Sequence, residues 1–213
     1  MGLKDFSKRK AGLRQRNPVI YIFCEDQKSA KKYFEEMRQK IQCRSAKIEI
    51  LSRGNADPLR LVKYVRKYIK DNQNNIIKGK DAFFCVFDED GRGDKKLQEI
   101  EKELSQKHGS LVTKVFSNPS FELWYLLHFI DQNAALNNNQ LIQKLQKSIP
   151  NYSKSEGYYN PLEKSLQTAI KRAKDMNEMH KRNGTKLFSQ NSNPSTQIFL
   201  IFECLCLQRL QSS

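Results

Sequence analysis

The chain has 213 residues, of which 38% are hydrophobic, 10% aromatic and 29% charged, a composition typical of a globular domain with material for one sizeable core. Lysine and arginine outnumber aspartate and glutamate by 38 to 23, so the formal net charge is +15. This imbalance indicates a polyanionic partner, with nucleic acid ahead of a membrane surface, although a well-solvated basic surface without a specific partner is the alternative.

Secretion and membrane insertion are not expected from this sequence. The N-terminal segment has no apolar stretch after its charges, which argues against a signal peptide. The longest apolar runs, residues 121–130 and 198–207, have about half the length of a membrane span, and each contains a glutamate. The cysteines lack the two-residue gap of zinc and redox motifs, so we expect buried, reduced thiols in a cytoplasmic protein. They are Cys24, Cys43, Cys85, Cys204 and Cys206.

Residues 1–16 carry six basic side chains against the single acid Asp5 and are expected to form a flexible basic arm. Residues 17–130 then alternate apolar runs of strand length with two-faced segments of helical period. This alternation predicts an α/β core with a parallel sheet flanked by helices on both faces. The expected strands are 19–24, 47–51, 81–87 and about 110–116, and the expected helices are about 27–41, 58–71 and 94–107.

Residues 131–213 are expected to form a helical, basic region packed on this core, with irregular stretches at 131–140 and 148–160. The expected helix starts place a capping residue before a proline at the first helical position. Glu163 lies three residues after Asn160 and completes a capping-box signature. The four expected starts are Asp57-Pro58, Asn118-Pro119, Asn160-Pro161 and Asn193-Pro194.

Acidic residues follow two of the expected strands. Glu25 and Asp26 come after the first strand, and Asp88, Glu89 and Asp90 come after the third. The carboxyl ends of parallel strands open onto one edge of a sheet, and the Asp-x-Asp spacing places both aspartates on one side if the chain stays extended. Converging carboxylates repel one another unless a cation neutralises them, and hard oxygen ligands suit Mg²⁺ or Mn²⁺. We therefore expect Glu25, Asp88 and Asp90 to bind the metal and to be catalytic; ordinary polar loops are the alternative.

The segment 117–124 follows the fourth expected strand, so the helix that it starts should open onto the same edge and could bind a phosphate. Asn118 and Glu122 are therefore further candidate catalytic residues. Glu122 would orient Asn118 or Lys28, or contact the metal through water. A helix cap followed by a dipole-compensating glutamate is the structural alternative. His128 is expected to be a packed histidine.

The helix expected at 58–71 carries an apolar stripe on one side and basic residues at steps of three and four on another. We expect these basic residues to have no acidic partners on the helix. Together with the N-terminal arm, this side could follow a phosphate backbone, although it is equally interpretable as a solvated face. The expected nucleic-acid-binding residues are Lys28, Arg53, Arg60, Lys63, Lys67, Arg92 and Lys95.

Over most of its length the chain resembles the RloB-like family, whose members occur near restriction and phage-defence genes and carry a TOPRIM-like core. The long Asn-Pro-Ser-Phe-Glu-Leu-Trp block is its most specific mark. The residues that carry the resemblance are Cys24-Glu25 with Lys28-Ser29 and Tyr33-Phe34, Asp57-Pro58-Leu59, residues 86–90, residues 117–124 with 126–129, and residues 193–196.

TOPRIM domains of topoisomerases, primases and several nucleases carry a glutamate after the first strand and an Asp-x-Asp after the third, and use them in Mg²⁺-assisted phosphoryl transfer. The resemblance therefore implies that Glu25 is a general base or acid and a metal ligand, and that Asp88 and Asp90 bind the metal. The sequence departs from the TOPRIM pattern at two positions, with Asp26 where glycine is usual and Ala30 where a second acid is expected.

These observations favour a Mg²⁺-dependent nuclease of TOPRIM type that acts on RNA or DNA in phage defence, with nucleic acid and a defence-system protein as expected partners. One alternative is a non-catalytic nucleic-acid-binding or complex-forming subunit of a defence system, whose acids are structural. Another is a phosphatase of haloacid-dehalogenase type with Asp88 as nucleophile. The phosphatase motif normally lies on the first strand and has threonine or valine where this chain has Arg92.

Overall fold

We describe the protein from a computed structural model that covers residues 16–41, 46–52 and 57–210, with the side chains of residues 207–210 excepted. Nearly all of the expected N-terminal arm, residues 1–15, lies outside the described residues, as does Arg53. Arg16 is described, and its Nη1 donates to the Asp81 carboxylate at 2.9 Å, so the end of the arm is tied to the start of a strand.

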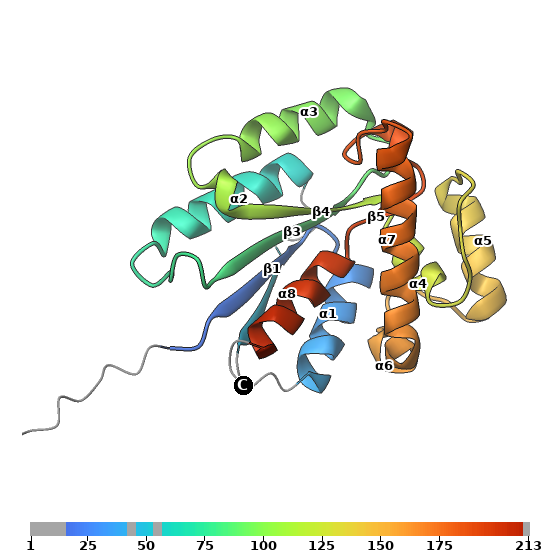
Figure 1. Cartoon of the computed structure of the whole chain (residues 1–213), viewed down its shortest axis with the longest axis horizontal. Coiled ribbons are helices and arrows are strands. Elements are labelled where there is room, and N and C mark those ends of the chain that lie inside the picture. Colours follow the sequence, from blue (N-terminus) through green and yellow to red (C-terminus); the bar gives the residue numbers. More distant parts are fainter. Residues whose placement is uncertain (1–15, 42–45, 53–56, 211–213) are drawn as a thin grey trace, which may run out of the picture.

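A five-stranded sheet of order β2-β1-β3-β4-β5 runs through the molecule (Figure 1). Its first four strands in the chain are parallel, and the fifth pairs antiparallel with β4. The predicted α/β fold with a sheet flanked by helices is therefore confirmed, with one short antiparallel strand in addition. The strands are β1 (Val19–Cys24), β2 (Lys47–Ser52), β3 (Ala82–Asp88), β4 (Val112–Asn118) and β5 (Ser195–Thr196).

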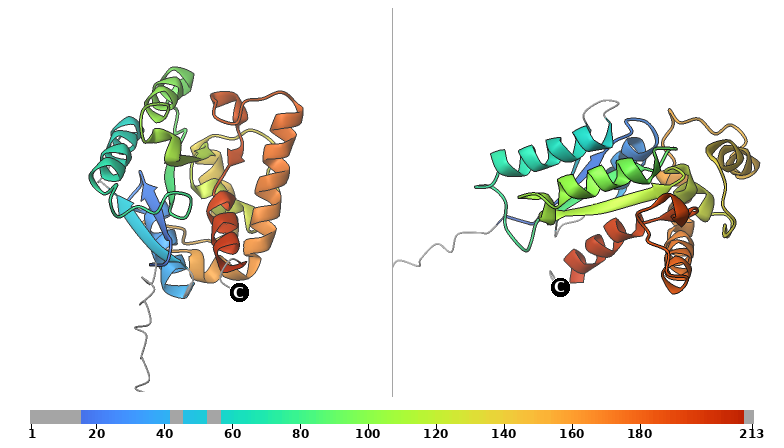
Figure 2. Two further views of the ribbon diagram at one scale, coloured as in Figure 1. Left: turned by 60° about the vertical axis from the view of Figure 1, so that its left-hand side comes forward. Right: turned by 90° about the horizontal axis from the view of Figure 1, so that it is seen from above.

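Helices cover both faces of the sheet (Figure 2). Side chains of a strand alternate between faces, so Tyr21 and Phe23 of β1 pack with α2 and α3, while Ile20 and Ile22 pack with α1 and the C-terminal helices. The nearly continuous apolar run of β1 is thus explained by burial on both sides. The helices are α1 (Ser29–Lys40), α2 (Pro58–Asp71), α3 (Gly93–Leu104), α4 (Glu122–Leu127), α5 (Asn138–Ser148), α6 (Tyr159–Leu162), α7 (Leu166–Arg182) and α8 (Phe199–Leu210), with 3₁₀ turns at Gly109–Leu111, Glu163–Ser165 and Gln190–Ser192.

The second half of the chain is mostly helical and shares a core with the sheet. Trp124 of α4 stacks on Phe202 of α8, with ring centroids 5.7 Å apart and planes at 19°. Residues of α1, α4, α5, α7 and α8 belong to one buried apolar cluster with β1 and β3. Since β5 also comes from this half, the C-terminal segment contributes both a strand and a layer of helices to the core.

The proline signals predicted one helix start correctly and failed at the other three. Asp57 caps α2, because its carboxylate accepts from the Leu59 amide at 2.9 Å and Pro58 is the first helical residue. Asn118-Pro119 and Asn193-Pro194 are cis peptide bonds, and they lead into a turn before α4 and into β5. Pro161 lies inside α6, whose N-cap is Tyr158, so no capping box forms at Asn160. The Pro119 carbonyl accepts from the Asp90 amide at 3.0 Å, and the Pro194 carbonyl lies 2.7 Å from His180 Nε2, so tertiary contacts accompany the loss of the local signal at these two prolines.

The irregular stretches are close to their predicted places. Helix α5 begins at Asn138, with a capping box between Asn137 and Gln140, so the first loop ends before the predicted residue 140. The chain between α5 and α6 is irregular, as predicted. Among the described cysteines, Cys24 and Cys85 are buried, whereas Cys206 is exposed and corrects the expectation of buried thiols. Within the described ranges, every helix is too short or too polar to cross a membrane.

His128, at the end of α4, is buried as expected. Its Nδ1 lies 2.8 Å from the Trp124 carbonyl oxygen, and its Nε2 is buried without a hydrogen-bond partner among the described residues. Burial, with a smaller contribution from Arg172, lowers the pKa of His128 from 6.5 to about 4. The unfolded chain therefore binds more protons than the folded one between these values, and folding stability is lost as the pH falls through this window.

We expect the wild-type protein to lose about 2 kcal/mol of unfolding free energy between pH 7 and pH 5 that a His128→Phe variant does not lose. Urea denaturation at pH 7, 6 and 5 measures the difference, and subtraction of the two proteins cancels the titration of other groups. Parallel pH profiles for the two proteins would contradict the assignment of a neutral, buried imidazole.

Candidate active site

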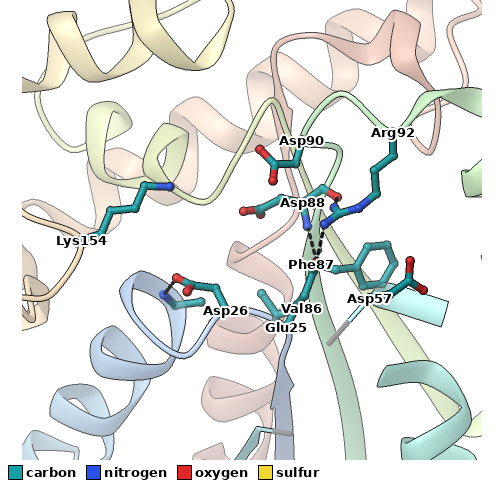
Figure 3. A pocket seen from close by; sticks show the side chains of 10 residues that line it. Glu25, Asp26, Asp57, Val86, Phe87, Asp88, Asp90, Arg92 and Lys154 are labelled. Atoms are coloured by element: carbon teal, nitrogen blue, oxygen red, sulfur yellow. Dashed lines mark hydrogen bonds and ion pairs between the residues drawn. The ribbon is translucent and has the colours of Figure 1, made fainter. Parts of the chain in front are cut away.

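A pocket of about 430 Å³ opens at the carboxyl ends of β1 and β3, the edge at which the sequence predicts the functional residues (Figure 3). Five carboxylates and two cations line it, together with apolar residues of the strand ends. The seven charged residues are Glu25, Asp26, Asp57, Asp88, Asp90, Arg92 and Lys154. The three predicted metal ligands therefore share one pocket.

The turn after β3 differs from the extended chain on which the Asp-x-Asp argument relied. Asp90 has a φ of 50°, and the turn continues through Gly91 at 74° and Gly93 at 81°, a region that favours glycine. Asp88 and Asp90 therefore do not alternate along a strand. Asp90 instead accepts a hydrogen bond from Asn138 Nδ2 at 2.8 Å, which links the turn to the first residue of α5.

Glu89, between the two predicted ligands, holds this turn in place. It is 6% exposed, and its carboxylate accepts hydrogen bonds from the Gly91 amide at 2.7 Å and the Gly93 amide at 2.9 Å. Its own amide donates to the Ser117 carbonyl at 2.8 Å. The Glu89 carboxylate is therefore occupied by backbone amides, and it fixes the backbone around Asp90.

Glu25 directly follows β1 and forms an ion pair with Arg92 Nη2. The other terminal nitrogen of Arg92, Nη1, donates to the backbone carbonyl of Asp88. Burial raises the pKa of Glu25 to about 7 in spite of Arg92, and the neighbouring carboxylates of Asp90 and Asp57 add to the rise. Arg92, predicted to contact nucleic acid, is thus engaged inside the protein.

Asp88 has a strongly raised pKa among the acids of the pocket. Burial raises its pKa well above the usual range, the carboxylates of Glu122 and Glu25 raise it further, and a hydrogen bond from the Phe121 backbone opposes the rise. A carboxyl group in this position is stabilised by a proton or by a cation.

The donor chemistry of the pocket fits a hard divalent cation, because carboxylate oxygens are the ligands that Mg²⁺ and Mn²⁺ prefer. In the described part of the chain, however, no three acidic, histidine or cysteine side chains are grouped so that they could hold one ion. Glu25 is held by Arg92, and Asp90 is held by Asn138. Metal binding by Glu25, Asp88 and Asp90 therefore stays a prediction, and it requires these side chains to exchange partners.

The two departures from the TOPRIM pattern have structural roles at the start of α1. The Asp26 carboxylate accepts from the amides of Lys28 at 2.8 Å, Ser29 at 2.5 Å and Ala30 at 3.4 Å, so it caps the helix. Ala30 is buried and lines the pocket with its methyl group. The chain turns from β1 into α1 through this cap.

Asn118 lies apart from the pocket. It is 1% exposed, and its Nδ2 donates to the backbone carbonyls of Ser189 at 3.2 Å and Gln190 at 3.1 Å. It ties the end of β4 to the C-terminal half of the chain, which is a structural role, and its catalytic role stays a prediction.

Glu122 is also 1% exposed, and it does not contact Asn118 or Lys28 as predicted. Its carboxylate accepts from the hydroxyls of Ser29 at 2.9 Å, Ser120 at 2.7 Å and Tyr152 at 2.8 Å. Lys154 Nζ lies 3.2 Å from its Oε1. Burial raises the pKa of Glu122, but Lys154 and the hydroxyl donors outweigh burial, so the pKa is lowered and the group stays charged.

Three residues of the site escaped the sequence analysis. Lys154 and Tyr152 belong to the irregular stretch between α5 and α6, where the sequence contains no motif that predicts a function. Asp57 was recognised as a helix cap, and the structure shows that it also lines the pocket and pairs with Lys96 at 3.4 Å. The signal for Asp57 was its place in a loop that follows a parallel strand.

The predicted nucleic-acid-binding residues are spread over several surfaces. Arg60, Lys63 and Lys67 are exposed along α2, and Lys28 and Lys95 are exposed at the starts of α1 and α3. The expectation of unpaired cations is wrong for Lys67, whose Nζ lies 2.7 Å from Asp71, four residues further along the helix. Such pairs form because residues four apart share a helix face.

Fold and site together define an α/β protein with an acidic pocket at the carboxyl edge of a mostly parallel sheet. A family model described as RloB-like protein matches residues 20–205, and the chain belongs to this family. Searches of curated proteins and of solved structures found no match. The predicted family is thereby confirmed, and the match spans both the sheet and the helical half.

Substitution of Glu89 should disturb the turn that carries Asp88, Asp90 and Arg92. We expect Glu89→Ala to lower the free energy of unfolding by about 2 kcal/mol or more, because two backbone N–H groups lose a charged acceptor. Glu99→Ala is the matched control, since Glu99 is an exposed acid of α3 paired with Lys96 at 3.3 Å. Urea denaturation compares the two variants, and equal small losses would show that Glu89 does not hold the turn.

Proposed function

We propose that the protein is a divalent-metal-dependent nuclease of TOPRIM type that hydrolyses phosphodiester bonds of RNA or DNA in phage defence. The observation that carries this proposal is the shared pocket of Glu25, Asp88 and Asp90 at the carboxyl edge of the sheet, in a chain of net charge +15. Acids concentrated at one site of a strongly basic protein suit a reaction in which the protein surface holds a polyanion and the carboxylates hold a metal.

Asp88, Asp90 and Glu25 would hold Mg²⁺ or Mn²⁺ in this pocket. When bound, the metal supplies neutralisation of phosphate charge and polarisation of the phosphorus–oxygen bond. Glu25, at the end of the neighbouring strand, is placed to accept the proton of an attacking water molecule. Arg92 would then be released from Glu25 toward the phosphate as the carboxylate changes partner.

Helix α2 supports a path for the nucleic-acid backbone away from the pocket. Asp57 lines the pocket and caps the helix, so α2 begins at the site. Arg60 and Lys63 are exposed on its first turns, and their regular spacing suits successive contacts with phosphates.

A non-catalytic nucleic-acid-binding subunit is a second candidate, which the ion pair between Arg92 and Glu25 favours. This pair neutralises the first predicted ligand without any metal. The phosphatase alternative gains no such support, because Asp88 ends the third strand of the chain, whereas the phosphatase motif normally lies on the first.

Loss of the Asp88 charge should separate catalysis from binding. We expect Asp88→Asn to lower the rate of metal-dependent cleavage by at least about 10²-fold, because it removes a metal ligand, and to leave nucleic-acid affinity within about twofold of wild type. The assay compares tRNA, single-stranded RNA, single-stranded DNA and plasmid with Mg²⁺, Mn²⁺ or EDTA. Asp175→Asn, at an exposed acid of α7, is the control.

Cleavage by Asp88→Asn at the wild-type rate would refute the proposed role of the pocket. Absence of cleavage by the wild-type protein, together with salt-sensitive binding that survives the substitution, would instead favour the binding subunit.

The α2 path has its own test in the salt dependence of binding. We expect Arg60→Gln and Lys63→Gln each to reduce the slope of log affinity against log salt by about 0.9 for duplex or 0.7 for single strands, because each removes one phosphate contact. Lys67→Gln should have a smaller effect, since Lys67 already pairs with Asp71. Fluorescence anisotropy in EDTA at four salt concentrations measures the slopes, and wild-type slopes for Arg60→Gln and Lys63→Gln would exclude this path.

A further inference from the structure

The two cations of the pocket differ in their exposure and in the groups that they contact. Arg92 directs both terminal nitrogens inward, to Glu25 and to the Asp88 carbonyl. Lys154 carries an ammonium group with three N–H donors, and its described ion pair is with Glu122 at 3.2 Å. Its side chain remains 54% exposed. Arg92 is only 21% exposed, so Lys154 is the pocket cation whose charged group is the more accessible to a ligand.

Glu122 fixes the position of this ammonium group. The carboxylate is 1% exposed and does not line the pocket, so it cannot meet a substrate directly. Hydroxyl groups of Ser29, Ser120 and Tyr152 hold it at distances of 2.7–2.9 Å. A buried carboxylate held in this way presents an immobile anchor to Lys154, whose opposite side faces the pocket.

The segment that carries Lys154 is itself attached to the core of the protein. Tyr152 donates to Glu122 at 2.8 Å, and its ring packs against Tyr158 with centroids 5.2 Å apart. The Ser153 amide donates to the Tyr158 hydroxyl at 2.9 Å, and Lys32 of α1 donates to the Ser155 carbonyl. Contacts on both sides of Lys154 therefore hold its backbone beside the pocket.

We propose that Lys154 binds the reacting phosphate of the nucleic acid, and that Glu122 is its positioning residue. The inference rests on the proposed nuclease function and adds a substrate contact to it. Figure 3 shows Lys154 reaching toward the aspartates from the side opposite Arg92. The ionised acids of the pocket repel an incoming phosphodiester, and an ammonium group fixed across from them offsets this repulsion and stabilises charge on a non-bridging phosphate oxygen.

Lys154 could instead serve only as the counterion of buried Glu122, and a double variant separates the two roles. Lys154→Gln alone leaves a buried carboxylate without its cation, so it should lower stability under either role. The double variant Lys154→Gln with Glu122→Gln removes both charges and should regain most of that stability in urea denaturation. Cleavage by the double variant should nevertheless stay about 10²–10³-fold below wild type, with the loss mainly in kcat. The single variant Lys154→Arg, which keeps a cation at this position, should cleave faster than the double variant.

Binding in EDTA supplies a second readout that does not need a cleaving enzyme. With a single-stranded 12-mer as probe, the double variant should show a slope of log affinity against log salt that is smaller by about 0.7. Lys171→Gln is the matched control, because Lys171 is 81% exposed on α7 and also pairs with an acid, Asp175. The control should keep the wild-type slope.

A double variant with wild-type stability, slope and cleavage would overturn the proposal and leave Lys154 as a counterion. This failure is distinct from failure of the nuclease function, which Asp88→Asn reports through cleavage alone. Wild-type protein that binds no nucleic acid at any salt concentration would overturn both.

Discussion

Crowding of negative charge at one edge of the sheet is the constraint on which the rest of the structure depends. Three of the buried or half-buried carboxylates there have partners that offset their charge. Glu25 pairs with Arg92, Glu122 is surrounded by hydroxyl donors and Lys154, and Glu89 accepts two glycine amides. Because a buried charge without a partner is costly, these contacts dictate the shapes of the turn after β3 and of the segment between α5 and α6. The surroundings of the pocket thus supply a cation or hydrogen-bond donors to these three acids.

Asp88, which lines the pocket, is the exception to this pattern. A backbone hydrogen bond from Phe121 lowers its pKa, but burial and the charges of Glu122 and Glu25 outweigh that bond. The neighbouring acids have partners, whereas the charged form of Asp88 is repelled by Glu122 and Glu25 and forms no ion pair within the described residues. This lack of compensation is the physical reason to expect a positive charge beside Asp88, either a metal ion or a cationic group that arrives with the substrate.

The elements that carry strong local signals were predictable. The apolar run of β1, the cap at Asp57 and the acids that end β1 and β3 are all encoded within a few residues, and each lies where the pattern indicates. Partners distant in sequence were not predictable: β5 is two residues long, and the pair of Glu122 with Lys154 joins a helix start to a loop 32 residues later. Secondary-structure propensity depends on a residue and its neighbours in the sequence, whereas these contacts depend on the tertiary packing of the whole chain.

The helical half of the chain is therefore part of the site and not an appendage to a sheet that carries it. It supplies Lys154 and Tyr152 on one side of the pocket and Asn138, the partner of Asp90, on another. The family match to residues 20–205 extends over these contributions. Without the helical half, Arg92 would be the one cation among the described residues that line the pocket. With the helical half in place, the same carboxylates face a second cation, Lys154, and the pocket has the mixed charge on which the proposed phosphoryl chemistry depends.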